Sequence, residues 1–314
     1  MALAASAAFC TASMARQPPG VKVQSAARSP IAAQATMLAS AWAGDRAVAV
    51  GEHGVVLTSD DKGAHWQQAK SVPVSFTLTS VSFVDENHGW AVGHGGSILK
   101  TVDGGTTWIV QRLATDVDRP LFSVYFTDAK NGIAVGLWSL VLKTGDGGKT
   151  WEERKVEPPP GGKKGDLNLL AIFPDKQGNL LAVAERGYVL KSSDFGATWS
   201  YHATGYSGSF WCGAALQNGK LLVGGQRGTL MRSDDGGLIW QHINLSTKNS
   251  ITSITVLGDT ILVTGMDGFA AMSSDGGANF KTLPRGDATT LTSALLAQKQ
   301  EPIVFSRRGV TKLR

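Results

Sequence analysis

Six regularly spaced aspartates are the most suggestive residues of this sequence, because carboxylates beside glycines are what a calcium-binding loop needs. A calcium loop, however, draws several carboxylate ligands from one short stretch. Each stretch here supplies one carboxylate at the repeated position, so we interpret the aspartates as structural and expect no metal site. The six are Asp61, Asp103, Asp146, Asp194, Asp235 and Asp275.

Other side chains that catalysis or nucleic-acid binding would use are scattered along the chain. The sequence has no His-Glu-x-x-His, Gly-x-Ser-x-Gly, Walker or Cys-x-x-Cys motif, and its six histidines fall among predicted turns and strand ends. Basic residues come in pairs, such as Lys163-Lys164 and Arg307-Arg308, without interleaved aromatic residues. The sequence therefore predicts no catalytic residue, no cofactor and no nucleic-acid partner.

Each of the six aspartates belongs to an octapeptide of the form Ser/Thr-x-Asp-x-Gly-x-x-Trp, with Phe280 in place of the last tryptophan. The aspartates are spaced 42, 43, 48, 41 and 40 residues apart. In such a turn the aspartate accepts backbone N–H groups, the glycine supplies a positive φ and the tryptophan lies across the hairpin. The octapeptide therefore predicts the same rigid hairpin turn six times.

A second landmark extends the repeat to seven units. Five residues before each octapeptide a small residue opens a short apolar run, and the same feature recurs 41 residues after Gly268, at Gly309, where no octapeptide follows. Unit three shows best that each unit holds four short strands. These span 121–126, 132–136, 139–144 and 150–154. Four strands per unit and a period of 40–48 residues predict an all-β, seven-bladed β-propeller, with residues 16–314 as one domain.

The ends of the repeat suggest how the ring closes. The first strand of each unit should be innermost, where the blades converge and small residues fit best. Such residues occur at Ser80, Ser123, Ala171, Gly213, Ser253 and Ser293. Unit seven has three predicted strands and no fourth, while Val21–Ser25 is strand-like and unassigned. We predict that Val21–Ser25 is the outer strand of blade seven, which leaves no unpaired edge at the seam.

Composition and the N-terminal residues bear on where the protein works. Of the 314 residues, 42% are hydrophobic, 18% are charged and 38 are glycine, which fits a folded domain with many tight turns. Residues 1–15 are small and apolar and end in Ser13-Met14-Ala15, which is typical of a truncated secretory signal and its cleavage site. No apolar run is long enough to span a membrane. We expect an exported protein, periplasmic or secreted, with Cys212 buried and inert in a strand.

The octapeptide resembles the Asp-box of BNR-repeat propellers, a group that includes sialidases. The fuller unit, from Gly89-Trp90-Ala91-Val92-Gly93 to Trp108, more closely resembles the photosystem II stability/assembly factor family. The resemblance covers nearly the whole mature chain. It implies an exported seven-bladed propeller that lacks catalytic residues and acts as a scaffold while a membrane protein is assembled, in the thylakoid lumen if the host is phototrophic. The arginine-rich strand segment of phototrophic members has no clear match in this sequence.

The sialidase branch of the resemblance leaves one enzyme alternative open. A sialidase-like glycoside hydrolase needs three arginines, a tyrosine nucleophile with a glutamate partner, and an acidic residue. The nearest counterparts here are Arg28, in Arg28-Ser29-Pro30-Ile31, and Tyr206, in a predicted loop between blades. No glutamate is obviously paired with Tyr206. The sequence favours a protein that is not an enzyme.

One set of turn residues stands out as a candidate binding surface. The turn between strands two and three projects from the face opposite the octapeptides, because strands alternate in direction within a blade. Arginine, tryptophan and histidine, which anchor protein interfaces, recur at its tip. The spacing of 48 adds a Pro/Gly-rich linker, 157–165, on the same face. The predicted partner-binding residues are His53, His94, Trp138, Lys163, Lys164, Arg186, Arg227 and Arg308. Solvated turn tips are the alternative interpretation.

These observations predict a monomeric, non-catalytic scaffold or accessory factor that binds an extracytoplasmic part of an integral membrane protein or complex. A net charge of +5 favours an anionic partner surface. A photosystem II assembly factor proper is the more specific alternative, and a sialidase-like hydrolase is the enzymatic one.

Overall fold

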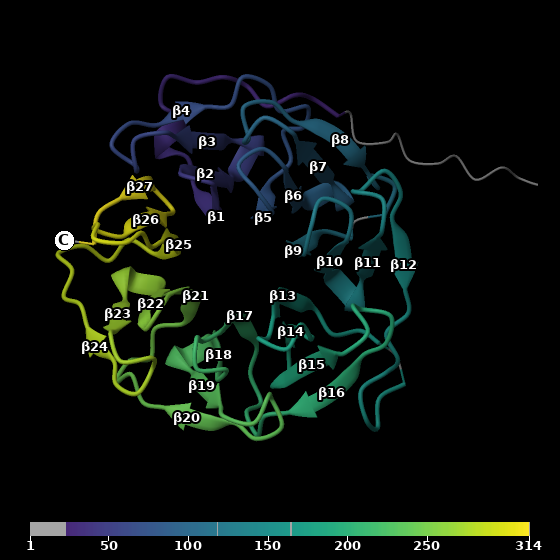
Figure 1. Cartoon of the computed structure of the whole chain (residues 1–314), viewed down its shortest axis with the longest axis vertical. Helices are drawn as coiled ribbons and strands as arrows, with labels where there is room; N and C mark the ends of the chain where they lie inside the picture. Colours follow the sequence, from purple (N-terminus) through teal and green to yellow (C-terminus); the bar gives the residue numbers. More distant parts are fainter. Residues whose placement is uncertain (1–22, 118, 164, 314) are drawn as a thin grey trace, which may run out of the picture.

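The computed structural model describes residues 23–117, 119–163 and 165–313. These residues form seven antiparallel sheets, one after another along the chain, that surround a central axis as blades (Figure 1). Helical structure in the described ranges is confined to short 3-10 turns. The seven-bladed, all-β propeller predicted from the repeat is confirmed.

The first four blades contain four strands each, with the first strand innermost. Blade one has β1 (Met37–Ala43), β2 (Arg46–Gly51), β3 (Val56–Ser59) and β4 (Gln67–Gln68). Blade two has β5 (Leu78–Phe83), β6 (Gly89–Gly93), β7 (Ile98–Thr101) and β8 (Ile109–Arg112). Blade three has β9 (Leu121–Phe126), β10 (Gly132–Gly136), β11 (Val141–Thr144) and β12 (Glu152–Arg154). Blade four has β13 (Leu169–Pro174), β14 (Leu180–Ala184), β15 (Tyr188–Ser192) and β16 (Ser200–Ala203).

The last three blades complete the ring, and blade seven has three strands among the described residues. Blade five has β17 (Phe210–Ala215), β18 (Leu221–Gly225), β19 (Leu230–Ser233) and β20 (Gln241–Ile243). Blade six has β21 (Ile251–Leu257), β22 (Thr260–Gly265), β23 (Ala270–Ser273) and β24 (Lys281–Thr282). Blade seven has β25 (Leu291–Leu295), β26 (Ile303–Ser306) and β27 (Gly309–Thr311). The 3-10 turns are η1 (Ala32–Gln34), η2 (Glu52–Gly54), η3 (His94–Gly96), η4 (Leu137–Ser139), η5 (Gln226–Gly228) and η6 (Met266–Gly268).

The innermost strands show why small residues are needed near the axis. The six predicted small residues all lie on innermost strands. At Gly213 an added Cβ would stand 2.2 Å from the ring of Phe173 on the neighbouring inner strand β13. Each inner strand also carries a β-bulge after its first residue, as between Leu78 and Ser80. The bulges have no signal in the repeat and were not predicted.

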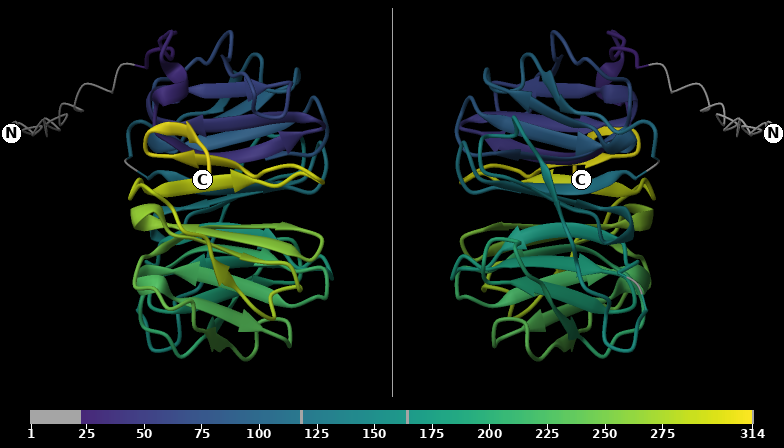
Figure 2. Two further views of the ribbon diagram at one scale, coloured as in Figure 1. Left: turned by 90° about the vertical axis from the view of Figure 1, so that its left-hand side faces the viewer. Right: turned by 90° about the vertical axis from the view of Figure 1, so that its right-hand side faces the viewer.

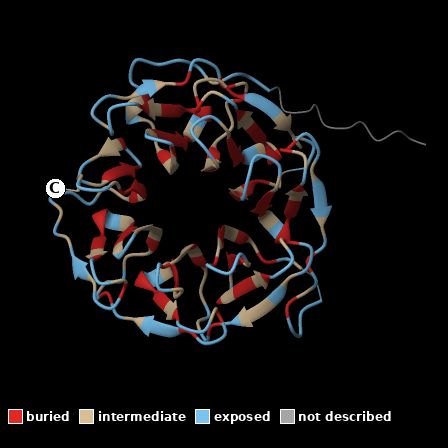
Figure 3. Ribbon diagram, in the orientation of Figure 1, coloured by how far each residue is buried: buried red, intermediate tan, exposed pale blue. Residues whose placement is uncertain are grey.

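The core lies between the blades rather than within them. Buried residues form seven clusters, and most of them run along the middle strands, while the outer strands are largely exposed (Figure 3). The aromatic residue of each Asp-box packs at a blade junction. The ring of Trp66 in blade one meets Phe305 of blade seven edge-on, with centroids 5.4 Å apart. The ring therefore joins two blades, beyond the single hairpin that the sequence predicts.

The predicted closing strand is wrong for the residues that the structure describes. Val23–Ser25 has no strand structure, and blade seven has the order β25-β26-β27. The Ala26 N–H donates to the Val72 carbonyl (3.0 Å), so this segment lies against the connection that leaves blade one. Val21 and Lys22 of the predicted strand lie outside the described residues. The prediction rested on the missing fourth strand of unit seven and did not consider the hydrogen bonds available to this segment beside blade one.

Side-chain contacts between the first and last inner strands join the seam instead. Ser40 and Ser293 share a hydrogen bond of 2.7 Å, and the Trp42 indole N–H donates to the Leu296 carbonyl (3.0 Å). The Thr292 hydroxyl, at a bulge, donates to the Met37 carbonyl. Bulge threonines make the same bond to the next blade elsewhere, as from Thr252. The seam thus uses the contacts of an ordinary blade junction.

Removing the aromatic ring at the seam should destabilise the whole propeller. Phe305 is fully buried between blades one and seven, so Phe305→Ala should lower the free energy of unfolding by about 3–5 kcal/mol. Trp138→Ala removes an aromatic ring that is 55% exposed and should change it by about 0.5 kcal/mol or less. Urea denaturation of both variants measures the difference. Equal, small effects would mean that the seam contributes little to stability.

Candidate partner-binding face

The turn between the second and third strand of each blade has a residue at its tip that we call the tip residue. The tip residues lie on one face of the disc, called the tip face, and Figure 2 shows the short helical turns along that side. They are His53, Gly95, Trp138, Arg186, Arg227, Asp267 and Arg308. Six of the seven have a left-handed backbone, with φ between 51° and 64°. Arg308 is the exception, and the following Gly309 takes φ 86° there.

The residue after each tip explains why the tip adopts this conformation. It is buried against the chain that leads to the next blade, with no room for a side chain in most blades. A Cβ at Gly54 would stand 2.1 Å from the Val74 carbonyl oxygen, and one at Gly228 would stand 2.2 Å from that of Thr247. The backbone must therefore reverse at the tip itself. In six blades the tip side chain points into solvent, and in blade two the tip is a glycine.

Backbone hydrogen bonds to the next blade hold two of the tips directly. The Trp138 N–H donates to Asn168 Oδ1 (3.1 Å), and the Arg227 N–H donates to Ser250 Oγ (3.2 Å). Both acceptors stand just before the inner strand of the following blade. These bonds use the backbone of the tip and leave its side chain free, so the side chain is presented from a fixed position.

The long linker of unit three brings two tips into one neighbourhood. Ser139, next to Trp138, donates its N–H to the Leu167 carbonyl (2.7 Å). Asp166, one residue earlier, lies 3.8 Å from a guanidinium nitrogen of Arg186. The linker therefore passes between the tips of blades three and four. The ion pair with Asp166 offsets part of the positive charge of Arg186, which the sequence did not predict.

The other predicted residues are distributed around the ring. His53, Arg227 and Arg308 are exposed tips of blades one, five and seven, and His94 is exposed beside the tip of blade two. Lys163 is exposed in the linker, and Lys164 lies outside the described residues. Among the residues described, no hydrogen bond or ion pair joins the tip side chains of two blades. The geometry supplies separate anchors on one face rather than a converging pocket.

The residues that a sialidase would need are not brought together. The Tyr206 hydroxyl donates to the Gln226 carbonyl (3.1 Å) and is tied to blade five. Arg28 lies in the segment beside blade one, where the Ser29 N–H donates to Gln68 Oε1 (2.9 Å). Among the residues that the structure describes, this hydroxyl has no carboxylate as a hydrogen-bond partner.

The Asp-boxes form the opposite face and have the predicted hydrogen bonds. In blade three the Thr150 N–H donates to Asp146 Oδ1 (3.0 Å), and the Thr144 hydroxyl donates to the same oxygen (2.8 Å). Thr144 Oγ accepts the N–H of Gly148, whose φ is 84°. Corresponding bonds recur in the other five boxes. The box aspartates are therefore structural acceptors.

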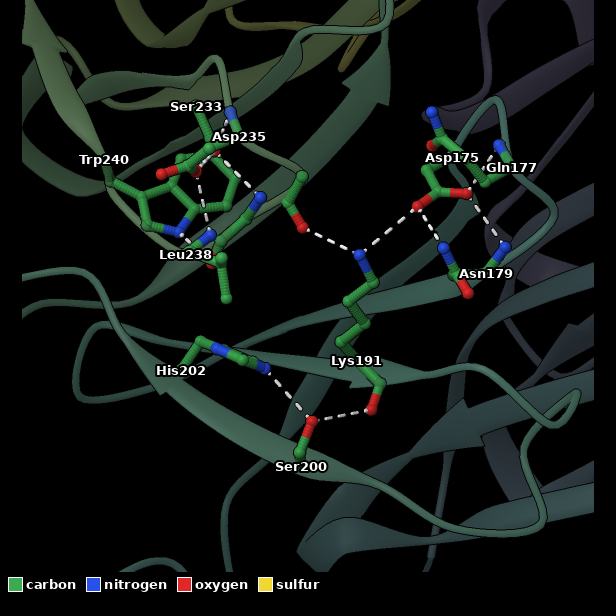
Figure 4. A network of polar contacts seen from close by, with 12 residues as sticks. Asp175, Gln177, Asn179, Lys191, Ser200, His202, Ser233, Asp235, Leu238 and Trp240 are labelled. Atoms are coloured by element: carbon green, nitrogen blue, oxygen red, sulfur yellow. Dashed lines mark hydrogen bonds and ion pairs between the residues drawn. The ribbon is translucent and has the colours of Figure 1, made fainter.

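Cations lock several Asp-boxes to the preceding blade. Lys191 of blade four donates to the Gly236 carbonyl in the box of blade five (2.9 Å), beside Ser233 and Asp235 (Figure 4). The same ammonium lies 3.5 Å from the buried Asp175 carboxylate. Asp175 also accepts hydrogen bonds from Gln177 and Asn179, so its buried charge is fully paired. The role of this network is therefore structural, because it joins blade four to the Asp-box of blade five.

The remaining groups of interest are the free cysteine and possible metal ligands. Cys212 is buried in β17 as predicted, and burial raises the pKa of its thiol to about 12, which keeps it protonated. No group of three His, Cys, Asp or Glu side chains in the described ranges has the arrangement of a metal site. The short helical turns of those ranges fall well below the length and apolarity that a membrane-crossing helix needs.

Comparison with known proteins finds similarity to one family over part of the chain. A family model described as "Photosynthesis system II assembly factor YCF48" matches residues 68–211, from the outer strand of blade one to the inner strand of blade five. The photosystem II assembly protein Ycf48 of Thermosynechococcus vestitus is 39% identical over 49 residues, 16% of this chain. The chloroplastic photosystem II stability/assembly factor HCF136 of Cyanidioschyzon merolae is 42% identical over 65 residues, 20% of this chain. These matches show that residues 68–211, somewhat less than half of the chain, are similar to photosystem II assembly factors.

Solved structures of this family share the fold over nearly the whole chain. The structure titled "YCF48 bound to D1 peptide" superposes with a TM-score of 0.73 at 17% identity, covering 92% of this chain and 98% of the other. YCF48 from Cyanidioschyzon merolae gives 0.70 at 16%, covering 90% and 96%. At identities of 17% and 16%, these superpositions establish the shared fold alone. The sequence matches to the two curated relatives span 14% of the length of each.

Acid should weaken the Asp-box turns of this protein in a defined pH window. Hydrogen bonds, led by those from the Thr150 and Thr198 hydroxyls, lower the pKa of Asp146 and Asp194 from 3.8 to about 2. A lowered folded-state pKa adds stability that is complete above pH 3.8 and is lost as the pH falls toward 2. The Tm should therefore drop steeply in that window. Asp146→Asn should lower the Tm at neutral pH and flatten the drop, as thermal melts across pH would show; an unchanged pH profile would contradict this role.

Proposed function

We propose that this protein is a non-catalytic assembly or accessory factor that binds an extracytoplasmic polypeptide segment of a membrane-protein complex on its tip face. One observation carries the proposal: non-glycine side chains stand at left-handed tips on a rigid ring and face solvent.

The backbone conformation of the tips argues against the alternative that they are ordinary solvated turn residues. A non-glycine residue in the left-handed region costs roughly 1–2 kcal/mol, which glycine avoids. Gly95 makes the same turn in blade two, so the fold itself does not need a side chain there. The turn therefore does not require the conformational free-energy cost that a non-glycine tip adds at Trp138, Arg186 and Arg227. Contact with a partner supplies a reason for it.

The chemistry of the tips indicates the kind of segment that would bind. Arginine binds a carboxylate with two parallel hydrogen bonds, while its stem and face pack on apolar groups. Trp138 adds a large apolar ring that is 55% exposed. Asp166 and Asp267 on the same face disfavour a uniformly acidic partner. A segment with acidic and apolar residues in alternation matches this surface best.

We base the proposed partner and compartment on the similarity to photosystem II assembly factors. A family member was solved with a D1 peptide bound, and the curated relatives are photosystem II assembly factors. These similarities favour a photosystem II subunit as the partner in a phototrophic host, with the thylakoid lumen as the compartment. In other hosts the partner would be a subunit of another integral membrane complex, and the compartment the periplasm. The predicted signal segment, residues 1–15, lies outside the described residues.

Replacing the three tip arginines together should strongly reduce partner recovery. In a pull-down from solubilised native membranes, Arg186→Ala/Arg227→Ala/Arg308→Ala should recover far less partner than wild type. Each partly desolvated pair contributes on the order of 1–3 kcal/mol, and rim pairs contribute less. The triple lysine variant keeps the charge but lacks the planar fork, so its recovery should be intermediate.

A matched control removes three cations from the Asp-box side. Lys130→Ala/Lys149→Ala/Lys176→Ala lowers the net charge by the same amount at exposed positions and should leave recovery unchanged. Circular dichroism confirms that each variant is folded. Equal recovery by wild type and a folded triple arginine variant would show that the tips are solvated turns.

A further inference from the structure

The second residue of each innermost strand lies in the β-bulge, and we call it the bulge residue. In blades two, six and seven it is a threonine, whose hydroxyl donates to the backbone carbonyl of the first residue of the next innermost strand. The bond from Thr79 to the Leu121 carbonyl is 2.7 Å long. A bulge side chain therefore lies over the junction between two neighbouring innermost strands, beside the axis of the ring (Figure 1).

Three consecutive blades have large apolar bulge residues. Blades three, four and five carry Phe122, Leu170 and Trp211, which we call the axial patch. Each of the three is half-buried, and none belongs to the seven apolar clusters of the described residues. Leu38 of blade one is the remaining apolar bulge residue and lies across the ring from blades four and five (Figure 1). The axial patch is thus an apolar surface outside the core.

The fold itself does not require large side chains at these positions. Threonine occupies the bulge in three blades, where it joins two blades through a hydrogen bond that phenylalanine, leucine and tryptophan cannot donate. Small residues also suit the narrow space near the axis of a propeller. Blades three to five therefore lack a junction hydrogen bond and leave large apolar groups partly in water. Contact with a partner supplies a reason for both features.

Hydrogen bonds place the axial patch beside the tips of the same blades. In blade five the Gln226 N–H, just before the tip Arg227, donates to the Ser209 carbonyl (3.0 Å), two residues before Trp211. The corresponding bond in blade three is 3.1 Å long. The apolar patch and the tip side chains therefore belong to one continuous surface.

In blade four a side chain makes the corresponding connection. Asn168 lies two residues before Leu170, and its Nδ2 donates to Oε1 of Glu185 (3.0 Å), just before the tip Arg186. Asn168 Oδ1 accepts the N–H of Trp138 (3.1 Å). One residue thus fixes the tips of blades three and four at the edge of the axial patch.

The combination of charge and apolar surface differs around the ring. Blades four and five pair an apolar bulge residue with an arginine tip, a combination that blades one, two, six and seven lack. In blade six a threonine bulge residue stands beside the tip Asp267. Arg186 already has Asp166 3.8 Å away, which leaves Arg227 as the stronger site for a carboxylate.

We propose that the axial patch binds one aromatic or aliphatic side chain of the partner segment, next to an acidic residue of that segment that pairs with Arg227. This inference rests on the proposed function, because it specifies where on the tip face the segment binds. A central apolar contact with charged contacts around it is the arrangement in which a few residues supply most of the binding energy.

Replacing the axial patch with the threonine of the other blades tests this inference. Phe122→Thr/Leu170→Thr/Trp211→Thr introduces a residue that the fold already accepts at three bulges, so the ring should stay closed. In the pull-down from solubilised native membranes, this variant should recover about tenfold less partner than wild type, an effect common for large apolar contacts at the centre of an interface. Leu38→Thr is the matched control on blade one and should recover as much partner as wild type. Circular dichroism confirms that both variants are folded.

Photo-crosslinking separates direct contact from an indirect effect on the tips. Trp211→p-benzoylphenylalanine places a photoreactive ring where an aromatic side chain already stands, and irradiation should join it covalently to the captured partner. Mass spectrometry should find an acidic residue next to the apolar residue at the crosslinked position. Leu38→p-benzoylphenylalanine should give no adduct. This measurement does not depend on the folding of the triple threonine variant.

Full recovery by the folded threonine variant overturns the inference, as does a captured partner that forms no adduct at position 211. An equal loss of recovery with Leu38→Thr also overturns it, because the effect would then be common to all bulge positions. If the triple arginine variant loses the partner and the threonine variant keeps it, the inference alone fails. A wild-type protein that captures no partner overturns the proposed function as well.

Discussion

Burial between neighbouring blades is the interaction on which the rest of this structure depends. The apolar clusters lie at the blade junctions, so a single blade has no core of its own and is stable only as part of a closed ring. An Asp-box ring packs near the rim at six of the junctions in the described residues, and small inner-strand residues let the blades meet at the axis. Closure follows from the same contacts, since blades one and seven pack as any other pair does.

A ring held in this way fixes the loops that leave it. The backbone of a tip turn is bonded to the following blade, so the turn cannot relax toward an easier conformation without disturbing a junction. The tips therefore keep their left-handed conformation and present their exposed side chains from fixed positions, as a binding face requires. The rigid frame lowers the entropy lost when those side chains meet a partner. This suits a protein that is similar to photosystem II assembly factors.

Much of the fold was predictable because the octapeptide predicts a hairpin turn and its regular spacing predicts the length of a blade. The positions of strands in blade three and the placing of Arg186 and Arg227 on one face follow from counting residues from each aspartate. The prediction of the closing strand was wrong because counting the strands of each unit gives no information on the acceptor that the Val72 carbonyl offers beside blade one. The Arg186–Asp166 pair forms between residues of different elements, where a pattern within one unit carries no information.

Hydrogen–deuterium exchange of the protein, free and bound to its captured partner, tests most directly whether the tip face is the working surface. Slower exchange on binding should appear in the tip turns of blades three to five, residues 137–139, 185–187 and 226–228, and in linker residues 157–168. The Asp-box turns at residues 146–150 and 194–198 should exchange at the same rate in both states. Protection confined to the Asp-box turns, with tip turns unchanged, would contradict the account and place the partner on the opposite face.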